Sequence, residues 1–241
     1  MEATVNRELF KRQRWFITGT DTDIGKTAIA AGLLQLLGDQ GLKTLGLKPI
    51  AAGCEMTEEG LRNSDALALQ AAANTPLDYA QINPIALQPP IAPHIAAQEQ
   101  GLAITVDKVA GYCRGALLQR TDIALIEGAG GWRVPLNLRE SFAGLAVALE
   151  CQVVLVVGVK LGCINHALLT AEAIARDGLQ IVGWVANIID PDGARIEENI
   201  ATLKSLLPAP CWGVVPFLDE PSAAAVASQL DSQTILECCY E

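Results

Sequence analysis

Two hydrophobic periods alternate along the chain. Short, continuous apolar runs are typical of buried strands, and between them apolar residues recur at steps of three and four, as on one face of a helix. The runs predict strands at residues 15–18, 44–49, 123–127, 153–159, 182–187 and 212–215. The longer steps predict helices at residues 27–37, 65–73, 106–120, 166–176 and 197–206. This alternation favours an α/β fold with a doubly wound, mostly parallel sheet flanked by helices.

We expect a single domain over residues 15–241, preceded by a short N-terminal extension at residues 1–14. No internal repeat, low-complexity tract or linker interrupts the alternation. The exception is residues 75–101, which contain five prolines and show no clear period. A long proline-rich loop in a compact domain is more often functional than idle. Ligands of such sheets bind beyond the carboxyl ends of the strands, so residues after each strand are the first candidates for a site.

The composition argues against several classes of partner. A net charge of −10 disfavours nucleic acid, whose binding proteins normally present a basic face. No apolar run reaches about 18 residues without a charge or a turn signal, so no membrane span is expected. The charged first fourteen residues lack the apolar core of a signal peptide. The seven cysteines form no CxxC pair, which indicates neither zinc nor a disulfide framework. We therefore expect a reduced, cytoplasmic protein.

A glycine-rich loop follows the first predicted strand. In "GTDTDIGKT", a turn at Gly19 precedes Gly25, Lys26 and Thr27 at the expected start of a helix. Gly25 would let the backbone approach an anion at the helix N-terminus, Lys26 could reach the outer phosphates, and the Thr27 hydroxyl could bind Mg²⁺. The standard loop has four residues between its glycines, whereas this one has five, residues 20–24. We favour a nucleotide site over an ordinary junction with a capping threonine.

Three charged residues follow other predicted strands. Glu127 ends an apolar strand before a run of glycines, where it could bind Mg²⁺ beside the phosphates. Lys48 lies between the second strand and a proline, a position that favours a functional lysine over a surface lysine. Asp65 begins a helix after Asn63, and its spacing alone favours an N-terminal cap over a metal ligand.

Six blocks of sequence occur in order between about Trp15 and Pro221. They are "GTDTDIGKT", "GLKPIAAG", "LRNSDALALQ", "EGAGGW", "VKLGCINHALLTAEAI" and "GWVANIIDP". Together they resemble the dethiobiotin synthetase family, the ATP-dependent ligases of biotin synthesis. The resemblance implies a fold of the P-loop NTPase type. The family characteristically has five residues between the loop glycines, which accounts for the unusual spacing.

The resemblance also implies a reaction. The family joins CO₂ to 7,8-diaminopelargonic acid and closes a cyclic urea at the expense of ATP. One amine becomes a carbamate, whose oxygen attacks the γ-phosphate, and the neighbouring amine captures the resulting carbamic-phosphoric anhydride. Because carbamate and γ-phosphate are both anions, positioned cations and Mg²⁺ are needed to bring them together. No protein nucleophile is required.

Residue roles follow from the same resemblance. Lys26 and Lys48 would flank the reacting groups, and Mg²⁺ would bind among Thr27, Asp65 and Glu127. The expected nucleotide-binding positions are Asp23, Ile24, Gly25, Lys26, Thr27, Ala28, Asp65, Glu127, Gly128, Ala129, Gly130, Asn187, Ile188, Pro216, Phe217 and Leu218. The expected substrate-binding positions are Lys48, Ala52, Gly162, Cys163 and Asn165.

The last three of these positions begin a predicted helix. In the family this helix start reaches the substrate carboxylate across the interface of a homodimer. On spacing alone, Asn165 could simply cap the helix. Two positions depart from the family pattern: Ala52 replaces a serine that contacts substrate, and Val134 replaces a residue that is often polar.

The rival interpretation is a P-loop switch ATPase of the partition or septum-positioning type. Such proteins usually carry a second lysine early in the loop, and residues 19–26 contain only Lys26. They also need a basic or amphipathic surface for DNA or membrane, which this acidic chain does not offer. The rival leaves Lys48 and Asp65 unexplained.

Overall fold

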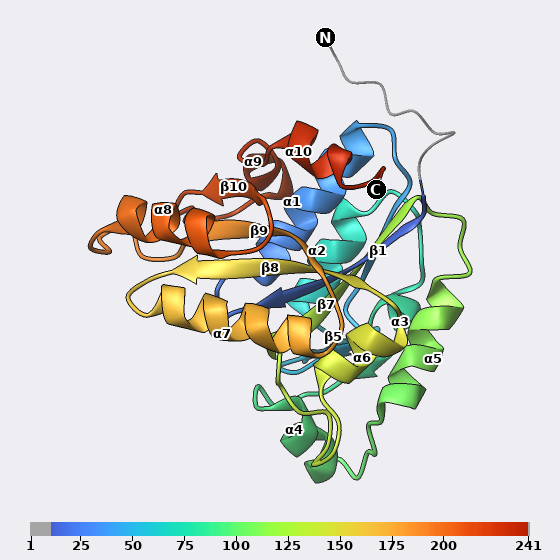
Figure 1. The fold of residues 1–241 in the computed structure, drawn as a ribbon. Helices are drawn as coiled ribbons and strands as arrows, with labels where there is room; N and C mark the ends of the chain where they lie inside the picture. Colours follow the sequence, from blue (N-terminus) through green and yellow to red (C-terminus); the bar gives the residue numbers. More distant parts are fainter. Residues whose placement is uncertain (1–10, 241) are drawn as a thin grey trace.

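A six-stranded parallel sheet forms the centre of the computed structural model, which describes residues 11–240 (Figure 1). The strand order is β10–β9–β8–β1–β7–β2, and all five pairings are parallel. The strands are β1 (Gln13–Gly19), β2 (Thr44–Leu47), β7 (Ile123–Gly131), β8 (Gln152–Val159), β9 (Ile181–Ile188) and β10 (Cys211–Val215). Each predicted strand overlaps one of these, so the predicted α/β sheet is confirmed.

Helices cover both faces of the sheet (Figure 1). One face carries α1 (Lys26–Asp39), α2 (Ser64–Ala72), α9 (Ala223–Ala227) and α10 (Ser232–Glu237). The other carries α5 (Val106–Ala116), α6 (Phe142–Ala148), α7 (Cys163–Arg176) and α8 (Ile196–Leu206). Successive side chains of β1 point to opposite faces: Trp15 and Ile17 pack in the core with α1, and Phe16 packs in the core with α6. Burial on both faces explains why the strands are continuous apolar runs.

The proline-rich segment differs from the expected irregular loop. It contains α3 (Tyr79–Ile82), β6 (Ile85–Ala86) and α4 (Pro93–Glu99). β6 pairs in parallel with β3 (Ile50–Ala51), which ties this segment to the chain that follows β2. Before α2, β4 (Glu55–Thr57) and β5 (Gly60–Arg62) form a small antiparallel hairpin. Elements this short span too few residues to produce a recognisable hydrophobic period.

The first strand begins two residues before its predicted start. Gln13 and Arg14 pair with β7, and the Arg12 guanidinium donates to the carbonyls of Leu117 and Gln119 at 2.5 and 2.8 Å. Residues 11–14 therefore contact the domain, while the rest of the expected extension lies outside the described residues. Within residues 11–240, no helix has the length and apolar character needed to cross a bilayer, and no disulfide joins the cysteines.

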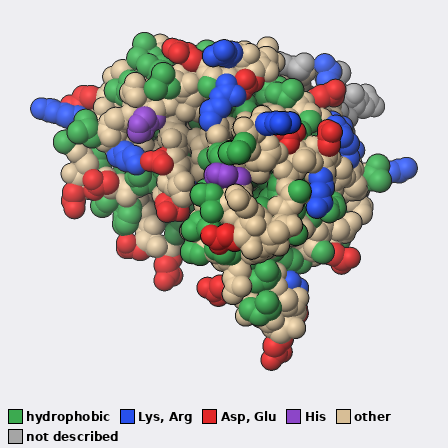
Figure 2. Space-filling model, turned by 90° about the horizontal axis from the view of Figure 1, so that it is seen from below, with side chains coloured by type: hydrophobic (Ala, Val, Ile, Leu, Met, Phe, Trp, Pro, Cys, Tyr) green, Lys and Arg blue, Asp and Glu red, His purple; other side chains and the backbone are tan. Residues whose placement is uncertain are grey.

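One face of the molecule shows how its charges are distributed (Figure 2). Lys and Arg side chains are scattered among Asp, Glu and hydrophobic side chains on this face, and no continuous basic surface forms on it. Such a mixed surface lacks the electrostatic footprint that proteins use to bind a phosphate backbone.

Candidate active site

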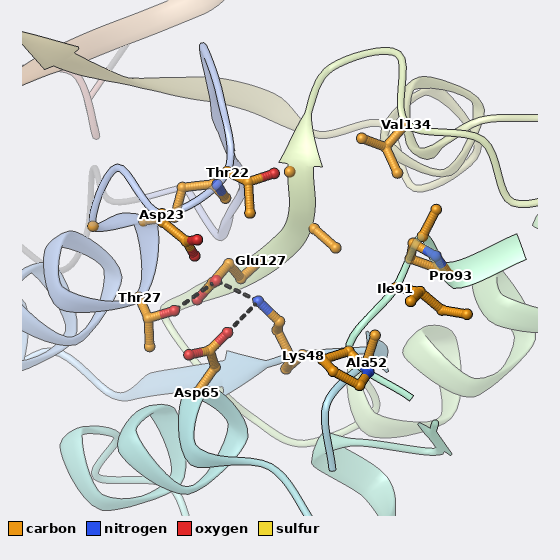
Figure 3. Close-up of a pocket in the computed structure, with 16 residues that line it drawn as sticks. Thr22, Asp23, Thr27, Lys48, Ala52, Asp65, Ile91, Pro93, Glu127 and Val134 are labelled. Atoms are coloured by element: carbon orange, nitrogen blue, oxygen red, sulfur yellow. Dashed lines mark hydrogen bonds and ion pairs between the residues drawn. The ribbon is translucent and has the colours of Figure 1, made fainter. Parts of the chain in front are cut away.

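The candidate active site lies at the carboxyl edge of the sheet, where the loop after β1 meets the ends of β2 and β7 (Figure 3). A pocket of about 720 Å³ opens there. Ten sequence-predicted residues line it: Asp23, Gly25, Lys26, Thr27, Lys48, Ala52, Asp65, Glu127, Ala129 and Gly130. The fold thus brings together residues that the sequence supplies in four separate blocks.

The glycine-rich loop owes its shape to a close approach between Gly25 and Asn187. Gly25 has φ +83°, and a Cβ atom there would lie 2.3 Å from the Asn187 side-chain nitrogen. That nitrogen donates to the Ile24 carbonyl at 2.8 Å, which ties the loop to the end of β9. Only glycine fits a backbone of this conformation at this distance. Gly25 is also the N-cap of α1, and no side chain caps that helix, so the capping-threonine alternative is wrong.

Lys26 is folded back onto its own loop. Its Nζ donates to the Asp21 carbonyl at 2.7 Å, while the Asp21 carboxylate pairs with Lys160, in the turn after β8, at 2.8 Å. Burial, together with the nearby charge of Lys48, lowers the pKa of Lys26 to about 8. In the free protein, Lys26 therefore loses its proton more easily than an exposed lysine.

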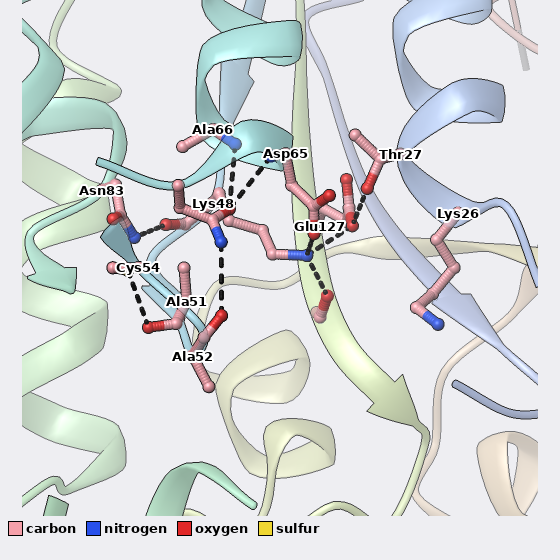
Figure 4. A network of polar contacts seen from close by, with 12 residues as sticks. Lys26, Thr27, Lys48, Ala51, Ala52, Cys54, Asp65, Ala66, Asn83 and Glu127 are labelled. Carbon is pink, nitrogen blue, oxygen red and sulfur yellow. Dashed lines mark hydrogen bonds and ion pairs between the residues drawn. The ribbon is translucent and has the colours of Figure 1, made fainter. Parts of the chain in front are cut away.

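Lys48 lies at the centre of a buried cluster (Figures 3 and 4). Its three N–H groups have three acceptors: Glu127 Oε1 at 2.5 Å, Asp65 Oδ2 at 2.9 Å and the Gly128 carbonyl at 3.2 Å. The Thr27 hydroxyl donates to the same Glu127 oxygen at 2.8 Å. Lys48 and Glu127 are almost completely buried, whereas the Asp65 side chain is 40% exposed. Four of the five expected catalytic and metal-binding side chains are therefore direct neighbours, and the fifth, Lys26, donates to its own loop instead.

The cluster stabilises the charged forms of its members. Burial alone would lower the pKa of Lys48, but the carboxylates of Glu127 and Asp65 raise it above its usual value. Burial would raise the pKa of Asp65, but Lys48 lowers it, with a hydrogen bond from Thr27 adding to the effect. The site therefore keeps the Lys48 ammonium group and the Asp65 carboxylate charged side by side at neutral pH.

Asp65 is oriented by a cap that it does not itself provide. The N-cap of α2 is Asn63, whose side-chain oxygen accepts the N–H groups of Asp65 and Ala66 at 3.1 and 3.2 Å. This leaves the Asp65 carboxylate directed at Lys48. The interpretation of Asp65 as a capping residue, which its spacing alone favoured, is therefore wrong.

A second, smaller pocket adjoins the first. It has a volume of about 190 Å³ and shares Asp23 and Gly25 with the larger pocket. The other sequence-predicted residues on its wall are Ala28, Asn187, Ile188, Pro216, Phe217 and Leu218. These six expected nucleotide-binding positions therefore lie together at one end of the phosphate-binding loop.

Two predicted nucleotide positions lie behind the pocket wall. The Ile24 side chain is fully buried in the core with α1, so only its backbone could contact a ligand. Gly128 does not line either of these pockets, and its carbonyl accepts a hydrogen bond from Lys48. Its observed contact is thus with the lysine.

Three predicted substrate positions are not brought into the pocket. Gly162, Cys163 and Asn165 lie at the start of α7, and none of them lines either pocket. Gly162, with φ +93°, is the N-cap, so Asn165 lies inside the helix and is not its cap. The Cys163 side chain is buried in the core between the sheet and α7. Within one copy of the chain, this helix start and the pocket are separate.

The pocket also contains residues that the sequence did not single out. Thr22 lies on its wall, and residues 90–93 at the start of α4 form the side opposite the phosphate-binding loop. Val134, noted as a departure from the family, also lines it. The prolines at positions 90 and 93 could have pointed to these pocket residues, because the proline-rich segment was expected to be functional.

Known proteins share both the sequence and the fold of this chain. A family model described as an AAA domain matches residues 13–225. The ATP-dependent dethiobiotin synthetase BioD of Cellvibrio japonicus is 58% identical over 226 residues, covering 94% of this chain and 99% of that protein. Its counterpart from Pseudomonas paraeruginosa is 57% identical over 217 residues, covering 90% and 95%. The chain belongs to the dethiobiotin synthetase family.

Solved structures of two cell division proteins share the fold of this chain. A chain of the MinC:MinD cell division complex of Aquifex aeolicus matches with a TM-score of 0.56 and 17% identity, covering 94% of this chain and 93% of that one. The cell division protein FtsY of Thermotoga maritima matches with a TM-score of 0.54 and 14% identity, covering 99% and 71%. At such low identity these likenesses concern the fold alone.

The low pKa of Lys26 predicts that nucleotide binding takes up a proton. Phosphates bound beside Lys26 should restore its pKa toward the usual value, so ADP binding near pH 8.5 should take up about three quarters of a proton, and binding near pH 7 only about a tenth. Calorimetry in two buffers of different ionisation enthalpy measures this uptake. Lys160→Met, which alters another lysine beside the loop, should leave it unchanged. Equal uptake at both pH values in the parent protein would contradict the prediction.

Proposed function

We propose that this protein is an ATP- and Mg²⁺-dependent dethiobiotin synthase of the cytoplasm. It would carboxylate 7,8-diaminopelargonic acid with CO₂ and close the ureido ring, giving dethiobiotin, ADP and phosphate. The observation that carries the proposal is the buried Lys48 cluster beside the phosphate-binding loop, in a chain 58% identical to a dethiobiotin synthetase over nearly its whole length. Switch ATPases share only the fold.

The reaction needs two amines of the substrate and no protein nucleophile. One amine adds to CO₂ to form a carbamate, and a carbamate oxygen attacks the γ-phosphorus as the bond to ADP breaks. The second amine then attacks the carbonyl carbon of the mixed anhydride and expels phosphate, which closes the ring. The protein's contribution is to position two anions and stabilise the charge that develops between them.

The two pockets suit the two ends of this reaction. The base would lie in the smaller pocket against Pro216, Phe217 and Leu218, and the phosphates would follow the loop to Lys26. The diamine would occupy the larger pocket, where Ala52 lies on the wall beyond Lys48. Lys48 lines the larger pocket and would direct its charge at the γ-phosphate and the carbamate.

The residues present fit a magnesium ion. The Glu127 carboxylate is buried, and among the described residues its Oε2 atom has no hydrogen-bond partner. Asp65 and the Thr27 hydroxyl supply the other oxygens nearby. Mg²⁺ is typically held by one or two carboxylates together with substrate phosphates. When bound, it would neutralise phosphate charge during transfer of the γ-phosphoryl group.

The start of α7 would bind the carboxylate of the substrate from a second copy of the chain. Backbone N–H groups at a helix N-terminus favour an anion, and Gly162, Cys163 and Asn165 stand at this one. In the turn just before it, Leu161 is 97% exposed, and Leu169 on α7 is 56% exposed. A second copy of the chain in contact with this helix start would cover both leucines, and we propose that this contact forms a homodimer.

One assay tests the proposed activity directly. The purified protein is incubated with ATP, Mg²⁺, bicarbonate and 7,8-diaminopelargonic acid, and the cyclic urea is detected by its mass. Omitting bicarbonate or the diamine should abolish product. A switch ATPase would release ADP and phosphate without any urea, and that result would reject the proposal.

Replacing Lys26 and replacing Lys48 should affect ATP binding and turnover differently. Lys26→Gln removes a phosphate contact, so ATP affinity should fall together with activity. Lys48→Gln should keep ATP affinity within about threefold and lower kcat about a hundredfold or more, because a cation aimed at developing charge is worth on the order of 3 kcal/mol. Calorimetry and mass detection of product measure the two effects. If Lys48→Gln forms product at the parent rate, Lys48 has only a structural role and its proposed catalytic role is wrong.

The two carboxylates should differ in their effect on stability. Asp65→Asn and Glu127→Gln should each raise the Mg²⁺ concentration for half-maximal turnover by about tenfold or more. Only Glu127→Gln should lower the melting temperature markedly, because breaking a buried ion pair costs about 3 kcal/mol. Asp107→Asn on α5 is the control and should change neither quantity. Unchanged Mg²⁺ dependence in both variants would remove these residues from the metal site.

The dimer can be tested through its exposed leucines. Leu161→Asp places a charge in the proposed contact, so it should shift the mass measured by light scattering from dimer toward monomer and lower the affinity for the diamine. Leu118→Asp, 84% exposed at the opposite edge of the sheet, should do neither. A parent protein that is monomeric and fully active at assay concentration would end the proposal of a shared site.

A further inference from the structure

A closed circuit of hydrogen bonds joins the backbone of Lys48 to that of Asp65. The peptide of Lys48 is held on both sides by the end of α3: its N–H donates to the Ile82 carbonyl at 3.0 Å, and its carbonyl accepts from Asn83 Nδ2 at 2.7 Å (Figure 4). Asn83 is only 3% exposed. A buried amide is costly unless its polar atoms have partners, so this contact is strongly specified.

Tyr79 carries the circuit from α3 to the segment before α2. Its hydroxyl donates to Asn83 Oδ1 at 3.0 Å and accepts the backbone N–H of Asn63 at 2.8 Å. The Arg62 guanidinium lies 4.3 Å from the centre of the tyrosine ring, which holds the ring against the hairpin. One oxygen atom therefore links two segments that have no regular pairing with each other.

Asn63 completes the circuit. Its side-chain oxygen caps the helix that carries Asp65, and its side-chain nitrogen donates to the Ala52 carbonyl at 3.3 Å. The Asp65 carboxylate then returns to Lys48 Nζ at 2.9 Å. The path through Lys48, Asn83, Tyr79, Asn63 and Asp65 thus begins and ends at the same lysine and touches the proposed substrate wall on its way.

We propose that Tyr79, Asn83 and Asn63 are positioning residues, which fix the Lys48 ammonium group relative to the phosphate-binding loop, with Asp65 as the carboxylate that orients it. The inference rests on the proposed function, since it gives Lys48 the role stated there. Lysine has a long, flexible side chain, and a cation misplaced by about 1 Å loses much of its effect on a transition state. The circuit restrains both the backbone that carries this cation and the helix that carries its carboxylate partner.

A purely structural role would give a different result. Side chains that only stabilise the segment between β2 and α3 would lower the melting temperature and the fraction of active enzyme, whatever residue stood at position 48. Positioning residues act through Lys48, so their effect must depend on Lys48 being present. A double-mutant cycle separates the two roles.

Tyr79→Phe is the variant of choice, because it removes one oxygen and keeps the ring beneath Arg62. We expect kcat for dethiobiotin formation to fall about tenfold, because both hydrogen bonds of the hydroxyl are lost and Asn83 is no longer joined to Asn63. Affinity for ADP should stay within about twofold, since neither Lys26 nor its loop belongs to the circuit. Tyr112→Phe, on the exposed side of α5, is the matched control and should leave kcat unchanged.

The deciding step combines Tyr79→Phe with Lys48→Gln. If Tyr79 acts through Lys48, the double variant should have the same residual rate as Lys48→Gln alone. A further tenfold loss would show independent effects and overturn the proposal. Should Tyr79→Phe lower the melting temperature by more than a few degrees, the same cycle is run with Asn83→Asp, which keeps the side-chain length and removes the donor to Lys48.

The readouts keep this inference distinct from the proposed function. Each variant is assayed for the cyclic urea and, separately, for Mg²⁺-dependent phosphate release from ATP. A parent enzyme that releases phosphate without urea would reject the proposed function, while the cycle on phosphate release would still decide whether Tyr79 acts through Lys48. Additive losses in a parent that makes urea would overturn the inference alone.

Discussion

The structure depends on a buried ammonium group that is neutralised from two sides. Lys48 is almost wholly removed from water, a state that costs several kcal/mol unless the charge is compensated. Glu127, from the central strand β7, and Asp65, from the start of α2, supply the compensation. Because the three groups come from different segments, the cluster can exist only when the sheet and the first helices are correctly assembled.

The same cluster explains why the site is prepared before any ligand arrives. The cations and carboxylates neutralise one another, and Lys26 rests on the Asp21 carbonyl. When a ligand binds, the lysines and carboxylates of the site exchange contacts with one another for contacts with the ligand. These charged groups are already in place and need not be drawn out of solvent. Such preorganisation lowers the reorganisation needed during the reaction.

The central sheet could be predicted because parallel strands buried on both faces have a clear sequence pattern. Each is a continuous apolar run that ends at a polar residue. Glu127 and Lys48 were found because each follows such a run. The phosphate-binding loop was predicted from Gly25, Lys26 and Thr27 at the expected start of a helix, although the five residues between its glycines depart from the standard spacing. Asp65 was harder, since a polar residue at a helix start usually caps it, and only the structure shows that Asn63 takes that role.

The hydrogen-bond circuit through Tyr79 and Asn83 has no comparable pattern in the sequence. Tyr79 begins the four-residue helix α3 and Asn83 is its C-cap. A helix this short shows no hydrophobic period, and the partners of both residues are fixed by the path of the folded chain. The pocket residues at the start of α4 were not predicted for the same reason, although the prolines there showed that the segment is unusual. Contacts between segments that meet only in the folded chain leave no local pattern in the sequence. Such contacts could not be predicted from the sequence.

The two cavities share a wall, and this has a practical consequence. Asp23 and Gly25 border both the large pocket and the small one, so the two cavities are adjacent. One inhibitor molecule could therefore occupy both, with a flat aromatic group at one end and a dianionic group at the other. Joining two weak fragments in this way makes the second binding event intramolecular, and the gain can reach several orders of magnitude when the linker matches the span. The phosphate-binding loop would then set the length of the linker.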